Sequence, residues 1–193
     1  MKNIKRSFVI ILILLTSSCN ESPKEFKLIS PSEAGKTESA DYCADYVTAL
    51  FANKVHMEKG LILTGTGGGG SSEKGLTMLS VSFEKDQKID LSEARKLIVE
   101  CTDEFVSEIN SSLDLKKHLF SVPFTYENIK ISILFVDQKE HEFVSPPFIS
   151  AIRISEGEIR YKIHENDHLK MVKEETYEEA LEILEQSENT SNL

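Results

Sequence analysis

The chain has 193 residues, of which 40% are hydrophobic, and its 32 acidic and 22 basic side chains give a formal net charge of −10. This length and composition suffice for one ordinary domain with a real hydrophobic core. The acidic balance argues against general nucleic-acid binding, which needs a cationic surface facing phosphate, and we expect no nucleic-acid partner.

The first 18 residues have the pattern of an export signal. The basic residues Lys2, Lys5 and Arg6 precede a short apolar run from Phe8 to Leu15, which small residues follow. An apolar run this short cannot cross a bilayer, which takes about 20 residues. We therefore predict that residues 1–18 are an export signal peptide, whose removal changes the formal charge from −10 to −13.

The segment Thr16-Ser17-Ser18-Cys19 resembles the lipobox of bacterial lipoproteins, although Thr16 stands where that family usually has leucine. The resemblance implies cleavage before Cys19, a lipid anchor on its sulfur, and a place in the bacterial cell envelope, at the inner or the outer membrane. The alternative is a plain secretory peptide that is cut after Ser18 and leaves Cys19 as an ordinary thiol. Residues 19–39 then comprise the lipidated cysteine and a flexible tether, because prolines and polar residues interrupt any apolar period.

Residues 40–188 alternate between helical and strand patterns. Apolar residues recur at helical spacing over residues 41–54, while capping-box patterns open helices at Asp90 and at Thr176. Strand patterns, apolar at every second residue or as short apolar runs, lie at 79–84, 129–135, 148–154, 159–163 and 169–172. We predict one α+β domain in two layers, an antiparallel sheet of about five to six strands with helices packed on one face. Residues 189–193 are expected to form a disordered tail.

The segment His164-Glu165-Asn166-Asp167-His168 spells the H-E-x-x-H signature of zinc peptidases. That motif needs a helix, on which both histidines share a face and the glutamate polarises the metal-bound water. Strand patterns on both sides instead predict a hairpin. We therefore expect no metal and no cofactor at this segment, with a zinc-dependent envelope metallohydrolase that uses His164, Glu165 and His168 as the alternative.

The hairpin register follows from keeping apolar residues on one side of the sheet. A turn at Glu156-Gly157 sets Ile154 opposite Ile159, and a three-residue loop at 165–167 then sets Ile163 opposite Leu169. In this register the outer face carries a basic stripe with six members: Arg153, Arg160, Lys162, His164, His168 and Lys170. Such a stripe is either a solvated face or a contact for an acidic partner or anionic headgroups.

The run Gly65-Thr66-Gly67-Gly68-Gly69-Gly70 matches the G-x-G-x-x-G pattern of dinucleotide-binding folds. In those folds the glycines open a helix that holds pyrophosphate, whereas here a strand pattern follows. We predict a mobile loop between a short strand near residues 61–63 and a strand that begins at Leu76. A ligand-binding loop is the alternative, because a backbone without side chains can approach a ligand closely.

Two further cysteines, Cys43 and Cys101, lie on the apolar faces of their expected helices. With Cys19 lipidated they form an even pair in an exported protein, which allows a disulfide. Two buried thiols are the alternative. Together these patterns predict a lipid-anchored envelope protein with a binding or structural domain that performs no catalysis.

Overall fold

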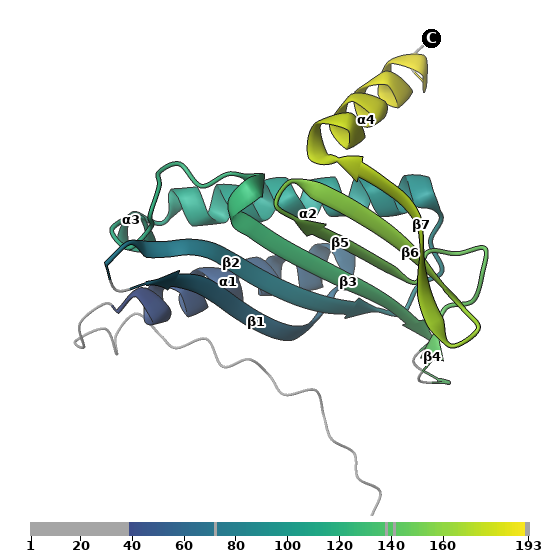
Figure 1. Cartoon of the computed structure of the whole chain (residues 1–193), viewed down its shortest axis with the longest axis horizontal. Coiled ribbons are helices and arrows are strands. Elements are labelled where there is room, and N and C mark those ends of the chain that lie inside the picture. Colours follow the sequence, from purple (N-terminus) through teal and green to yellow (C-terminus); the bar gives the residue numbers. More distant parts are fainter. Residues whose placement is uncertain (1–38, 72, 138, 141, 192–193) are drawn as a thin grey trace, which may run out of the picture.

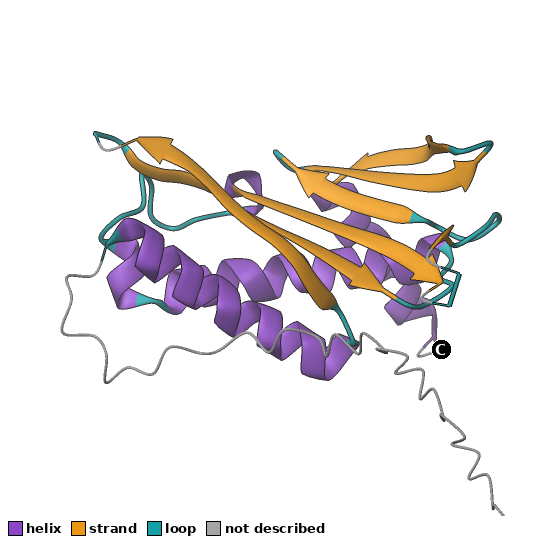
Figure 2. Ribbon diagram, turned by 90° about the horizontal axis from the view of Figure 1, so that it is seen from below, coloured by secondary structure: helices purple, strands orange, loops and turns teal. Residues whose placement is uncertain are grey.

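The computed structural model describes residues 39–71, 73–137, 139–140 and 142–191. They form an α+β domain in two layers, in which a seven-stranded sheet is covered on one face by helices (Figures 1 and 2). The sequence-based fold class is therefore confirmed. The helices are α1 (Ala40–Lys59), α2 (Leu91–Ser111), α3 (Leu113–Lys116) and α4 (Tyr177–Ser191), and a 3-10 turn spans Tyr126–Asn128. The strands are β1 (Ile62–Ser71), β2 (Gly75–Lys85), β3 (Ile129–Asp137), β4 (Glu142–Phe143), β5 (Ala151–Ser155), β6 (Glu158–Glu165) and β7 (His168–Thr176).

The strands follow the order β1-β2-β3-β5-β6-β7, with the short β4 paired to β3. The expected antiparallel meander is present as β3, β5, β6 and β7. Its first hairpin has the predicted register, with Ile154 opposite Ile159 across the turn. The sequence patterns did not reveal that β2 and β3 run parallel. They are parallel because α2 carries the chain back along the sheet between them.

The helices begin where the sequence patterns placed them. At Asp90 the side chain accepts the amide of Glu93, whose carboxylate accepts the amide of Asp90, so α2 opens with a complete capping box. Thr176 and Glu179 make the same reciprocal pair at α4. α4 continues to Ser191, so residues 189–191 belong to a helix rather than to a disordered tail.

The expected glycine loop is wrong, because Gly65–Gly70 lie within β1. This strand pairs antiparallel with β2 along its whole length, with irregularities after Leu63 and after Gly69. Glycine is a poor strand former. Here, backbone hydrogen bonds to β2 hold the strand, and Leu79, Val81 and Phe83 of β2 fill the core beneath the sheet.

A buried ion pair joins the helical layer to the last strand of the sheet. The guanidinium of Arg95 on α2 donates from Nε and Nη2 to the two carboxylate oxygens of Glu175 on β7, at 2.7 and 3.0 Å. The hydroxyl of Tyr161 on β6 donates to the same carboxylate at 2.7 Å. Arg95 is 8% exposed and Glu175 is 3% exposed. Burial raises the pKa of Glu175, but the hydrogen bonds from Arg95 and Tyr161 outweigh it, and the net pKa is lowered.

We predict that Arg95→Ala lowers the free energy of unfolding by about 3–5 kcal/mol, because it leaves the buried carboxylate with only the partly exposed Lys173, whose Nζ lies 3.7 Å away, as a cation. Urea denaturation measures this loss. The control is Arg160→Ala, since Arg160 also pairs with a glutamate of β7, Glu174, but at the exposed surface. Its removal should change stability little. Equal losses in the two variants would show that the buried pair has no special role.

The lowered pKa of Glu175 also predicts a pH dependence. A carboxylate whose pKa falls below its usual 4.5 on folding adds stability above pH 4.5, and this contribution is lost as the pH falls through the folded-state value. The parent should therefore lose stability on acidification below about pH 4.5. Glu175→Gln should lose less over the same range, as measured by thermal melts at successive pH values.

Candidate functional site

The segment that resembles a zinc peptidase motif is a hairpin turn, as the sequence predicted. β6 ends at Glu165, β7 begins at His168, and the turn residues Asn166 and Asp167 have φ angles of 53° and 61°. Two successive left-handed residues define the tight two-residue turn that suits a twisted hairpin. The predicted three-residue loop is therefore wrong, and His164 instead lies opposite Leu169.

The tighter turn separates the two histidines. His168 pairs with Glu165, which shares the core-facing side of β6 with Ile163, whereas His164 lies on the outer side. A shift of one residue in register moves every side chain of a strand to the other face. The prediction that His164 and His168 both lie on the outer face is therefore wrong, and the two imidazoles, on opposite faces, cannot hold one metal ion together.

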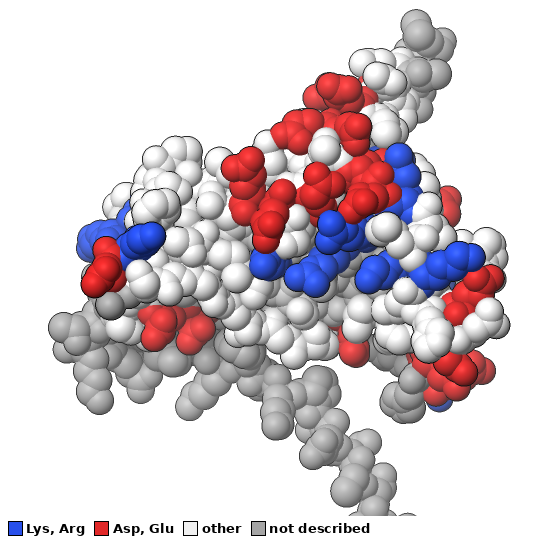
Figure 3. All heavy atoms as spheres, in the orientation of Figure 1, with Lys and Arg blue, Asp and Glu red and all other residues white. Residues whose placement is uncertain are grey.

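The same shift changes the basic stripe. Arg153, Arg160 and Lys162 lie on the outer face as expected, but Lys170 pairs with Ile163 and lies on the other side of the sheet. Figure 3 shows that acidic side chains border the remaining cations on the outer face. Arg160 is engaged by Glu174. The stripe is thus shorter and more nearly neutralised than the sequence suggested.

The two internal cysteines are both buried, and no disulfide joins Cys43 on α1 to Cys101 on α2. The sequence allowed either a disulfide or two buried thiols, and the structure has two buried thiols. Burial raises the pKa of the Cys101 thiol to about 12. Cys101 therefore has almost no thiolate at neutral pH and cannot serve as a nucleophile. Cys19 and its lipobox-like segment lie outside the described residues.

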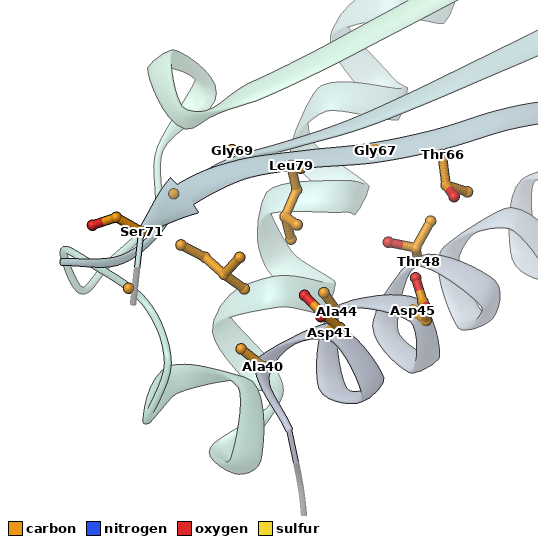
Figure 4. Close-up of a pocket in the computed structure, with 14 residues that line it drawn as sticks. Ala40, Asp41, Ala44, Asp45, Thr48, Thr66, Gly67, Gly69, Ser71 and Leu79 are labelled. Atoms are coloured by element: carbon orange, nitrogen blue, oxygen red, sulfur yellow. The ribbon is translucent and has the colours of Figure 1, made fainter. Parts of the chain in front are cut away.

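A hollow of about 700 Å³ lies between α1 and β1, and its volume is in the range of small-ligand sites. The helix contributes one wall with residues that recur every three or four positions and therefore share one side of α1. They are Ala40, Asp41, Ala44, Asp45 and Thr48. In Figure 4 the carboxylates of Asp41 and Asp45 point from α1 toward the strand.

The strand contributes the opposite wall. It consists of residues 66–71 of β1, together with Gly75, Leu76 and Leu79 of β2. Four consecutive glycines, residues 67–70, leave the middle of the β1 segment without side chains, so the backbone of β1 is accessible from the hollow. Thr66 and Thr48 face each other at one end, and Ser71 and Ala40 mark the other (Figure 4).

The hollow has a negative field. Asp41 and Asp45 are both exposed, and no lysine, arginine or histidine is among the described residues that line the hollow. Carboxylates four positions apart on a helix repel each other. Asp41 lies in the first turn of α1, where the helix dipole stabilises a carboxylate, but Asp45 lies beyond that turn. The local helix therefore gives no reason for the second carboxylate.

Thr48 is a polar side chain on the α1 wall of the hollow. The residue as a whole is 4% exposed, but its Oγ1 is not among the described buried side-chain atoms that lack a hydrogen-bond partner, which are Oγ1 of Thr102 and Oε2 of Glu104. Its side chain points from α1 toward β1 (Figure 4). A ligand in the hollow could form a hydrogen bond with this hydroxyl.

β1 lies at one edge of the sheet, and among the described strands it pairs with β2 alone. It has no charged residue and no proline in its ten residues. The opposite edge, β7, carries Lys170, Lys173, Glu174 and Glu175. Proteins usually protect free edges from further pairing with charges of this kind. Only the β7 edge is protected in this way, so the open edge of β1 coincides with the hollow.

Part of this site was predictable from the sequence. It singled out the glycine run, and it kept a ligand-binding role for that run as an alternative. It missed Asp41, Asp45 and Thr48, although their spacing on a predicted helix places them on one side. Nothing in the sequence pattern indicated that the glycines would form the wall opposite α1, because a run of glycines is typical of a loop.

Within the described residues, no group of three His, Cys, Asp or Glu side chains could hold a metal ion. None of the described helices is long and apolar enough to span a membrane. No protein-family model, no curated protein and no solved structure matches the chain. The function is therefore argued from the geometry of this structure.

We predict that Asn166→Gly leaves stability unchanged or raises it by less than about 1 kcal/mol, because glycine adopts left-handed angles freely. Asp167→Pro should be destabilising by more than about 1 kcal/mol, since proline requires a negative φ at a position where φ is 61°. Thermal melts with and without a chelator test both variants. A melting temperature of the parent that falls with the chelator would indicate a bound metal and contradict the hairpin interpretation.

Proposed function

We propose that this chain is a non-catalytic binding module of the bacterial cell envelope, anchored by lipid on Cys19, and that its binding site is the hollow between α1 and β1. One observation carries the binding role: the uncharged edge strand of the described sheet, β1, faces a hollow that Asp41 and Asp45 line from α1, with no cation among its described lining residues.

The position of the hollow agrees with attachment through the N-terminal segment. Ala40, the first residue of α1, lines the hollow, so the chain that leads back to Cys19 leaves the domain beside the site. In this proposal the anchor holds the site at the membrane, where partners of the envelope are concentrated. The support for the anchor itself is the resemblance at residues 16–19.

The catalytic alternative is less well supported by the geometry. A zinc hydrolase would need His164 and His168 on one side, with Glu165 between them and near the metal-bound water. These residues occupy a strand, a turn and the next strand, and the two histidines lie on opposite sides of the sheet. His164, Glu165 and His168 therefore do not have the arrangement that this motif has in zinc peptidases.

The anchor predicts a clear labelling result. Full-length protein expressed in bacterial cells should incorporate labelled palmitate and partition into detergent, and Cys19→Ser should lose both properties. The internal thiols give a control, because Cys43→Ser and Cys101→Ser should keep the label. Label that persists in Cys19→Ser would remove the lipid anchor from the proposal.

Occupancy of the hollow can be tested in cells without knowledge of the ligand. A photo-crosslinking residue, benzoylphenylalanine, replaces Thr66, which points into the hollow (Figure 4). The matched control replaces Thr64, which is exposed on the same strand but does not line the hollow. Irradiation should give a discrete adduct from position 66 and none from position 64. Equal adducts, or none at either position, would contradict a binding role for the hollow.

A further inference from the structure

We infer that the ligand of the hollow is an extended polypeptide segment with a basic side chain, which adds to the free edge of β1 as a further strand of the sheet. This inference rests on the proposed function, since it names the ligand class of the same site. Two features carry it, the edge backbone of β1 and the carboxylate pair on α1, and the hydroxyl of Thr48 offers a further polar contact.

The backbone of β1 selects the form of the ligand. Along the edge away from β2, its amide and carbonyl groups face no other described strand, and an extended peptide satisfies such groups in regular succession. Bulky or charged side chains on an edge strand hinder this pairing, and the run of four glycines removes them. A compact small molecule would leave most of these groups unpaired.

The wall of α1 selects the side chains. Successive residues on one face of a strand are about 6.6 Å apart, and residues four positions apart on a helix are separated by about 6 Å along its axis. Side chains at alternate positions of an added strand would therefore advance along the hollow in step with α1. A lysine or arginine between Asp41 and Asp45 would relieve the repulsion of the two carboxylates. The next side chain facing the hollow would then lie near Thr48, where a polar group could form a hydrogen bond with the hydroxyl.

Charge argues against a second copy of the chain as the occupant. Pairing β1 with β1 of another molecule would bring a second Asp41 and Asp45 pair toward the same junction, without a cation in either lining. Both molecules are also strongly acidic. Like charges at a junction oppose association. A basic segment instead complements the field of the hollow.

The test uses the full-length lipoprotein in detergent and two blocked peptides. The peptides are acetyl-Ser-Thr-Val-Lys-Val-Thr-Ser-amide and the same sequence with glutamate in place of lysine. Isothermal titration calorimetry measures the affinity of each peptide at low and at high salt. The lysine peptide should bind at least ten-fold more tightly than the glutamate peptide, and salt should reduce this preference. Hydrogen exchange should slow at the amides of β1 when the lysine peptide is bound, because strand addition pairs them.

Variants separate the two parts of the inference, which are the addition of a strand to β1 and the recognition of a basic side chain by Asp41 and Asp45. Asp41→Asn with Asp45→Asn should abolish the preference for lysine while keeping the slowed exchange at β1 with either peptide. Thr66→Lys should prevent binding of the lysine peptide, because it places a cation in the hollow, whereas Thr64→Lys should bind as the parent does. Thr48→Val, which has nearly the same shape, should weaken binding of the lysine peptide several-fold.

Other outcomes would overturn the inference. Equal affinity for both peptides, or unchanged exchange at β1, would exclude a basic strand as the ligand. A concentration-dependent dimer that protects β1 without peptide would identify a second copy as the occupant. Slow exchange at β1 in the peptide-free monomer, lost on deletion of residues 20–38, would identify the chain's own N-terminal segment. An adduct at position 66 in cells with no peptide binding would reject this ligand class while leaving the proposed function intact.

Discussion

The buried ion pair between Arg95 and Glu175 fixes how the last strand of the sheet meets the helical layer. A charged pair at the interface of two layers is favourable only when each partner is held in place by further hydrogen bonds. Tyr161 supplies one of these to Glu175. The pair requires Glu175 to face the helices, and this requirement fixes the face and the register of β7 where it leads into α4.

The hairpin of β6 and β7 meets that requirement by combining a tight turn with a bulge. From the two-residue turn, Ile163 lies opposite Lys170, and this register alone would turn Glu175 outward. The register changes between Lys162 and Tyr161, where Val172 is the extra residue of β7. Bulges of this kind re-aim the side chains that follow them. The bulge returns Glu175 to the core side, while the turn leaves His164 and His168 on opposite faces.

The two edges of the sheet differ in chemistry, and this difference has consequences for function. β7 presents charges along its length and leads directly into α4. β1 presents an uncharged backbone beside a hollow whose other wall is acidic. Asp45 and Thr48 place a carboxylate and a hydroxyl on the wall of α1 that faces this edge. In the proposed function, these groups contact the partner that the hollow binds.

The sequence by itself determined the elements whose energetics are local. The capping boxes at Asp90 and Thr176, the turn at Glu156-Gly157 and the alternating strands were all legible, because each depends on backbone and side-chain preferences within a few residues. The hollow could be predicted only in part: the glycine run was identified from the sequence, but its place in an edge strand was not.

Tertiary structure alone decided which side of β7 faces the helices and what lies opposite α1. The partner that orients Glu175 is Arg95, 80 positions away, and the apolar pattern of β7 favoured a different register. The glycine run became a strand because β2 offered it a complete ladder of hydrogen bonds, although its own propensity favoured a loop. In both places a long-range interaction outweighed the local preference that a sequence pattern records.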